Sequence, residues 1–168
     1  MNDIVVIFNS RSGATTLNGN RNDVTYNFDW SKLKETKYEV SMSCNMGALA
    51  WNGDKLAMLY THFGNTPLVY KTDTTTASLN TEFMGFLTPK ILQNSTPALA
   101  TYLSAAESDN PHFHLGGRPT QYNPRVTFRD STGALLTDSA GAEIPHYILM
   151  IRLTEVADYR IDRYANIK

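Results

Sequence analysis

Apolar and polar residues alternate one for one along several stretches of this chain, and this period of two constrains its fold more than any other feature. The clearest cases are residues 125–129 and 147–153, where apolar side chains occupy every second position. Successive side chains of a β-strand point to opposite faces of a sheet, so this pattern predicts strands with one buried face. Residues 24–30, 38–46 and 56–62 alternate in the same way. The chain is therefore expected to be all-β.

Turn signals separate the predicted strands. Asn52-Gly53 is a typical hairpin dipeptide, and residues 130–133 (Asp-Ser-Thr-Gly) lie between the last two alternating stretches. About eight strand segments in a chain of this length predict a single antiparallel jelly-roll β-sandwich over residues 1–156, followed by a C-terminal tail over residues 157–168. An immunoglobulin-like sandwich is the alternative, and the lack of a cysteine pair disfavours it.

Three segments fit the alternating pattern less well. Residues 4–8 are a continuous apolar run, which predicts a strand buried on both faces. Residues 9–22 are rich in Ser, Thr, Asn and Gly and are expected to form a surface loop. The pattern weakens over residues 89–109, where residues 99–107 are expected to form a short helix or an irregular crossover.

Composition excludes several classes of protein. The 168 residues are 42% hydrophobic, which suits one domain with a substantial core. The net charge is −1 with Lys and Arg scattered singly, so the sequence offers no basic stripe for nucleic acid. No apolar run approaches the roughly 20 residues of a membrane span. Cys44 is the single cysteine, so an internal disulfide is excluded and a reducing cytoplasm is expected as the site of folding.

The alternating stretches also predict the core. Cys44 lies at an inward position between two methionines, where a buried and unreactive thiol is expected. The residues expected to be mostly buried between two sheets are Tyr26, Phe28, Trp30, Tyr38, Val40, Met42, Cys44, Val126, Phe128, Leu149 and Ile151.

A search for catalytic chemistry assigns no catalytic residue, metal or cofactor. His112 and His114 could place two imidazoles on one face of a strand, as the metal site of a cupin requires. No carboxylate follows them until Asp130, however, and His146 is the only further candidate in that part of the chain. The sequence contains no Gly-x-Ser-x-Gly nucleophile elbow and no complete phosphate-binding loop.

Contact residues are expected in loops and in the tail instead. Trp51 precedes the tight Asn52-Gly53 turn, where an aromatic side chain is often exposed to a partner. Arg11 lies in the polar loop after the first apolar run. The tail combines aromatic and Arg residues in positions that often anchor interfaces. The interface candidates are Arg11, Trp51, Tyr159, Arg160, Arg163 and Tyr164.

Several segments together resemble the small single jelly-roll capsid proteins, of minor capsid and penton type, of large icosahedral double-stranded DNA viruses. The segments span most of the chain in order: Phe8-Asn9-Ser10, Tyr26 to Trp30, Lys37 to Val40, Asp109 to Pro119, Val126 to Asp130 with Gly133, and Pro145 to Leu149.

The resemblance implies a structural role without catalysis or cofactor. It also implies contacts with major and minor capsid proteins and with other copies of the chain, and a place in the virion after synthesis in the host cell cytoplasm. The alternatives are a non-viral trimeric jelly-roll module, a carbohydrate-binding module and, least favoured, a cupin-like metal enzyme.

Overall fold

The computed structural model describes residues 3–11, 14–29, 31, 33–34, 36–51, 57–61, 69–72, 77–80, 83–104, 113–116 and 123–156. These residues contain no α-helix and form thirteen strands, paired antiparallel throughout. The strands are β1 (Asp3–Asn9), β2 (Ala14–Asn20), β3 (Asp23–Tyr26), β4 (Lys37–Met46), β5 (Leu49–Ala50), β6 (Ala57–Thr61), β7 (Val69–Thr72), β8 (Ala77–Asn80), β9 (Phe83–Gln93), β10 (Leu99–Ser104), β11 (Phe113–Gly116), β12 (Arg125–Arg129) and β13 (Tyr147–Glu155). The prediction of an all-β protein is confirmed.

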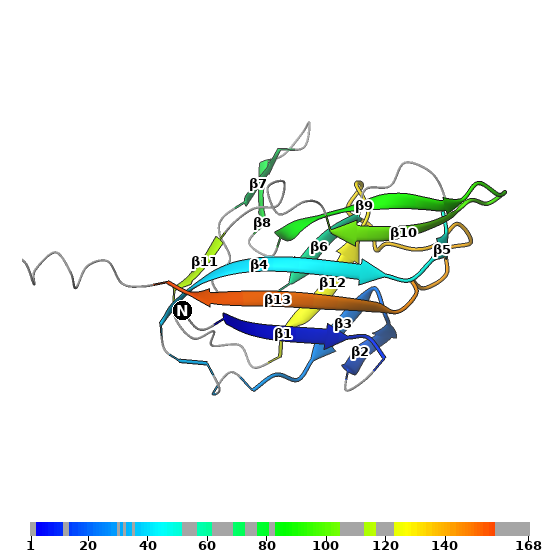
Figure 1. The fold of residues 1–168 in the computed structure, drawn as a ribbon. Coiled ribbons are helices and arrows are strands. Elements are labelled where there is room, and N and C mark those ends of the chain that lie inside the picture. The colour runs from blue at the N-terminus through cyan, green and yellow to red at the C-terminus, as the bar shows by residue number, and fades with distance from the viewer. Residues whose placement is uncertain are drawn as a thin grey trace, which may run out of the picture.

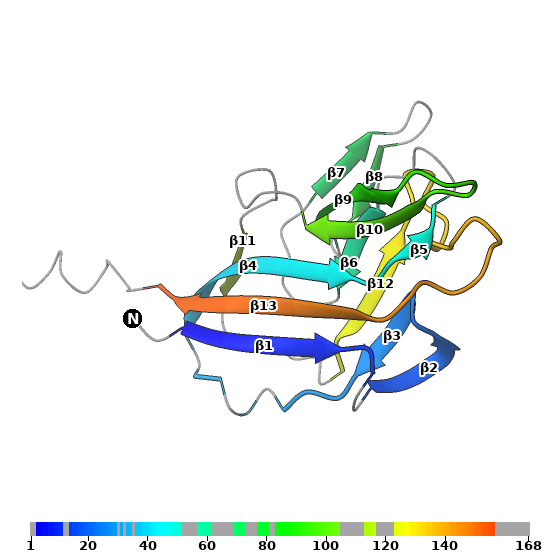
Figure 2. The same ribbon diagram turned by 45° about the vertical axis from the view of Figure 1, so that its right-hand side comes forward.

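Eleven strands of the described chain belong to one hydrogen-bonded sheet. Its order is β1-β13-β4-β10-β9-β6-β12-β3-β2, with β11 also paired to β4 and β5 to β10. β7 and β8 pair with each other in a separate small sheet. The sheet folds back at the β9–β10 hairpin, so that β12 crosses behind β13 and β4, with β3 beside it (Figures 1 and 2). The arrangement is compatible with a β-sandwich.

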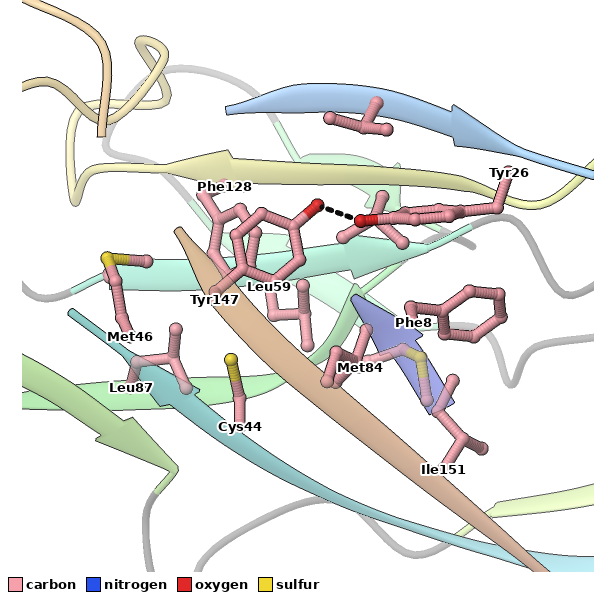
Figure 3. Packing of buried hydrophobic residues seen from close by; sticks show 14 of the residues in the cluster. Phe8, Tyr26, Cys44, Met46, Leu59, Met84, Leu87, Phe128, Tyr147 and Ile151 are labelled. Atoms are coloured by element: carbon pink, nitrogen blue, oxygen red, sulfur yellow. Dashed lines mark hydrogen bonds between the residues drawn. The ribbon is translucent and has the colours of Figure 1, made fainter. Parts of the chain in front are cut away.

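Aromatic side chains from β1 and β13 meet those from β3 and β12 in the core. The rings of Phe8 on β1 and Tyr26 on β3 have centroids 4.9 Å apart, and those of Phe128 on β12 and Tyr147 on β13 are 4.6 Å apart. The Tyr26 hydroxyl donates a 2.9 Å hydrogen bond to the Tyr147 hydroxyl in the same space (Figure 3). The Tyr26–Tyr147 hydrogen bond joins residues that are 121 positions apart in the sequence.

Most of the predicted core is confirmed, because the period of two places these side chains on inward faces. The residues that are buried as expected are Tyr26, Tyr38, Val40, Cys44, Val126, Phe128, Leu149 and Ile151. Phe28 and Met42 are only partly buried and pack against this core. Trp30 lies outside the described residues.

The polar face of β3 is buried as well. Asp23 lies at 6% exposure and accepts hydrogen bonds from Arg125 Nε and Nη2, both at 2.6 Å. This bidentate pair joins β3 to the neighbouring β12, so a buried carboxylate on an inner strand has the partner that it needs.

The structure corrects three expectations for less regular segments. Residues 99–104 form strand β10 rather than a helix or a crossover, because Ala100 and Tyr102 alternate into the core. The expected loop over residues 9–22 contains strand β2, which pairs with β3. In β1 only one face is buried: Val6 and Phe8 point inward, whereas Val5 and Ile7 are 49% and 60% exposed. β1 is an edge strand of the described sheet, and its outer face is exposed.

Candidate functional site

Two of the six predicted interface residues lie in the described part of the chain. Arg11 is exposed just beyond β1, and its backbone N–H donates a 2.9 Å hydrogen bond to Asn9 Oδ1. Tyr159, Arg160, Arg163 and Tyr164 lie outside the described residues. The assignment of these tail residues to an interface stays a prediction.

Trp51 is less accessible than its place next to a turn suggests. Its side chain packs against the hydrophobic core, and its backbone N–H donates a 2.7 Å hydrogen bond to the Ala98 carbonyl. The indole Nε1 is buried without a hydrogen-bond partner among the described residues. Trp51 and Arg11 belong to different parts of the fold, and no contact between them is seen.

The histidines do not gather in the described part of the structure. His112 lies outside it, and His114 belongs to β11, where its backbone is opposite Glu39 of β4. His146 lies in the segment before β13 and contacts Ser10 and Arg21. Among the described residues, no group of three or more His, Cys, Asp or Glu side chains could hold a metal ion.

A polar cluster that the sequence did not reveal joins three loops around His146. Arg21 Nη2 forms a 3.1 Å ion pair with Glu143, and Arg21 Nε donates a 2.7 Å hydrogen bond to the Ile144 carbonyl. On one side of the imidazole ring, Nδ1 lies 3.2 Å from Ser10 Oγ. On the other side, Nε2 lies 3.5 Å from Arg21 Nη1.

The donors around this ring decide what the cluster can do. A guanidinium can only donate, so the 3.5 Å contact assigns Nε2 as the acceptor and places the proton of the matching tautomer on Nδ1. Ser10 Oγ also accepts the Tyr147 N–H at 2.9 Å. A serine nucleophile needs a neighbouring base that takes its proton, and here the facing nitrogen already carries one. The contacts of this cluster fit a role in joining loops.

The segment between β12 and β13 contains the same turn twice. Asp130 Oδ1 accepts the N–H groups of Thr132 and Ala134, and Asp138 Oδ1 accepts those of Ala140 and Ala142. In each turn the aspartate backbone N–H also donates to the carbonyl four residues on. The glycines Gly133 and Gly141 have φ values of +88° and +77°, which favour glycine. The repeated sequence Asp-Ser-x-Gly-Ala, eight residues apart, is the signal that could have predicted this pair.

Both turns are tied to other parts of the fold. Leu136, between the turns, is fully buried, and its carbonyl accepts a 3.0 Å hydrogen bond from Asn22 Nδ2. The Ser139 N–H donates to the Ala50 carbonyl at 2.8 Å. This end of the molecule is therefore a set of loops held together by specific hydrogen bonds.

Apolar side chains are exposed at two other places. The first is the outer face of β1 and β13, where Val5, Ile7 and Ile148 are exposed. Beside them is a hollow of about 280 Å³ whose lining includes Ser41, Met150 and Arg152. The second is the β9–β10 hairpin, which extends beyond the body of the sheet and exposes Ile91 and Leu92 (Figure 1). Exposed apolar patches of this kind are typical of protein contact sites.

Thiol chemistry is not suggested by the one cysteine. Cys44 is fully buried on β4, and this burial raises the pKa of its thiol to about 12. The reactive thiolate form is therefore scarce at neutral pH.

No protein-family model matches the chain, and no curated protein sequence matches it. In the part of the chain that the structure describes, no helix is long and apolar enough to cross a bilayer.

Proposed function

We propose that this chain is a structural subunit of an icosahedral virus capsid, of minor capsid or penton type, that acts through protein–protein contacts. The observation that carries the proposal is the strand order. One group has the order β1-β13-β4-β10 and the other β3-β12-β6-β9, and the chain passes from one group to the other at most of its connections. Two facing groups of four strands with crossing connections are what a jelly roll requires, and capsid subunits commonly use this fold.

The exposed surfaces support the same proposal. Val5, Ile7 and Ile148 on one face and the β9–β10 hairpin on another are apolar in a chain with a net charge of −1. Such surfaces suit protein neighbours, and subunits of a shell hold together through many contacts of moderate strength. On this proposal the partners are major and minor capsid proteins and other copies of the chain, and the protein belongs to the virion after synthesis in the host cytoplasm.

The test is the composition of purified particles. Virions from the source cells, purified on a density gradient and washed with high salt, are analysed by quantitative mass spectrometry. We expect the chain in a fixed ratio to the major capsid protein in every preparation. Absence from the particles, or a ratio that varies with the washing, contradicts the proposal. Binding of the purified chain to a glycan array, combined with such absence, would favour a carbohydrate-binding module instead.

A pair of variants links the particles to a surface of the structure. The double variant Ile91→Asp with Leu92→Asp removes the exposed apolar side chains of the β9–β10 hairpin and should reduce incorporation into particles. Asn94→Asp is the matched control, because it adds a charge at the tip of the same exposed hairpin without removing an apolar group. Equal incorporation of the double variant and the control would exclude this hairpin as an assembly contact.

A further inference from the structure

We propose that two copies of this chain pair edge to edge through β1, antiparallel and across a two-fold axis at Ile7. The pairing would extend the strand group β1-β13-β4-β10 of one copy into the same group of the other. This inference rests on β1 and the charged residues at its two ends, and it goes beyond the capsid proposal, since it holds whether or not the chain belongs to a virion.

The main-chain groups on one side of β1 are directed away from the sheet. β1 pairs with β13 in continuous register from Asp3 opposite Thr154 to Asn9 opposite Ile148. The next pair, Ser10 and Tyr147, is joined by a 3.1 Å hydrogen bond from the Ser10 N–H. Because hydrogen-bonded pairs alternate along an antiparallel ladder, Ile4, Val6 and Phe8 bond to β13. The N–H and C=O groups of Asp3, Val5, Ile7 and Asn9 therefore face the free edge.

Within β1 itself, the residues and bulges that normally prevent strand addition are missing. Between Asp3 and Asn9 there is no Lys, Arg, Pro or Gly, and the register with β13 has no bulge. In the described part of the chain, no strand pairs with β1 on this side. The residues that present their main chain to the edge include Val5 and Ile7, whose apolar side chains are exposed. A long and regular edge with these side chains is suited to receive another strand.

The charges at the two ends of β1 favour a second copy as the partner and fix its direction. Asp3 is exposed at the beginning of the strand and Arg11 is exposed just beyond its end. Antiparallel pairing about Ile7 places Asp3 of each copy opposite Arg11 of the other and Ile7 opposite Ile7. Parallel pairing would place like charges together at both ends. The strand is thus self-complementary in one orientation, as a two-fold symmetric contact requires.

The experiment is sedimentation equilibrium of the purified full chain over a range of concentrations. We expect a monomer–dimer equilibrium that Ile7→Lys weakens by about tenfold or more, since a lysine on an edge strand opposes pairing. Thr88→Lys is the matched control: it places the same charge at an exposed β-branched position of β9, a strand that does not pair with β1, and should leave the equilibrium unchanged. Thermal unfolding followed by circular dichroism checks that each variant is folded.

Charge reversal tests the register and does not depend on Ile7. Asp3→Arg and Arg11→Asp should each weaken dimerisation by roughly tenfold, because each places like charges together at both ends of the paired strands. The double variant should regain most of the loss. The proposal would be overturned if the chain were monomeric at every concentration or if Ile7→Lys left dimerisation unchanged. It would also be overturned if the double reversal dimerised more weakly than either single reversal.

Discussion

The two tyrosine hydroxyls in the core depend on each other. Tyr26 donates to Tyr147 at 2.9 Å, and both side chains are buried. Tyr26→Phe removes the donor and leaves the Tyr147 hydroxyl in the core without this bond, which should lower the free energy of unfolding by about 1–3 kcal/mol. The double variant with Tyr147→Phe should lose less than the sum of the two single losses. Urea unfolding of the four proteins measures this coupling, and simple additivity would show that the hydroxyls are not paired.

Buried acidic groups should make the protein sensitive to alkali. Burial raises the pKa of Cys44 from 9.0 to about 12 and also raises the pKa of Tyr26 and Tyr147. Above pH 9 the unfolded chain loses the thiol proton while the folded chain keeps it, so the folded state is disfavoured as the pH rises. The free energy of unfolding should fall by up to about 1.4 kcal/mol per pH unit for each such group.

Cys44→Ala separates the thiol from the tyrosines. The variant should be less stable at neutral pH because it loses a buried side chain, yet its stability should fall less steeply between pH 9 and 10. Urea unfolding at closely spaced pH values gives both slopes. Identical slopes for the two proteins would mean that the thiol does not contribute to the alkaline loss.

At the scale of elements, the two Asp-Ser-x-Gly-Ala turns provide a built-in comparison. Asp130 is buried and also accepts the Thr132 hydroxyl at 2.6 Å, whereas Asp138 is more exposed. Asp130→Ala should lower the free energy of unfolding by about 2 kcal/mol and Asp138→Ala by about 1 kcal/mol. The smaller loss is expected because the N–H groups that Asp138 leaves unpaired can bond to water. Thermal unfolding of the two variants checks the order, and a larger loss for Asp138→Ala would contradict it.

The need for glycine in the Asp138 turn can be tested at Gly141 without a steric clash. A Cβ at Gly141 would meet nothing within 4 Å, so Gly141→Ala reports the backbone conformation alone. With φ at +77°, the substitution should cost about 1 kcal/mol. An unchanged thermal midpoint would show that the turn tolerates alanine.

Strands were predictable from the sequence where one face is buried over a long, regular stretch. β4 and β13 show this, since their buried residues lie on one alternating face: Tyr38, Val40 and Cys44 on β4, and Leu149 and Ile151 on β13. β10 escaped prediction because it is short, and Ala and Leu within it are equally compatible with a helix. β2 was not predicted because an edge strand can be polar on both faces and then lacks the alternating pattern.

The clusters between loops could not be predicted from sequence spacing. Ser10, Arg21, Glu143 and His146 come together only because β1 and the segment before β13 lie side by side. The exposure of Val5 and Ile7 could not be predicted for a related reason. A run of apolar residues looks the same whether both of its faces are covered or only one, and the pairing of distant strands decides between these cases.

For the whole molecule, a backbone hydrogen bond holds the chain to β4 just before the predicted tail. The Val156 N–H donates to the Lys37 carbonyl at 2.9 Å, directly after β13. Deletion of residues 158–168 should therefore leave the domain folded, with a thermal midpoint within a few degrees of the full chain, while weakening incorporation into particles. Unfolding of the truncated chain would show that the tail is part of the core. Normal incorporation would place the assembly contacts on the loops or sheet edges.

The position of β13 between β1 and β4 also sets an order in time. On the ribosome, β1 and β4 are made long before β13, and the sheet has no direct pairing between them. β1 and β4 each have an unpaired edge until β13 is synthesised and pairs with both. Folding of this group is thus postponed until β13 has been synthesised, when its most distant segments can first meet. During that interval the nascent chain exposes inner strand edges that the finished protein covers, and a slow or truncated translation product would be prone to aggregate.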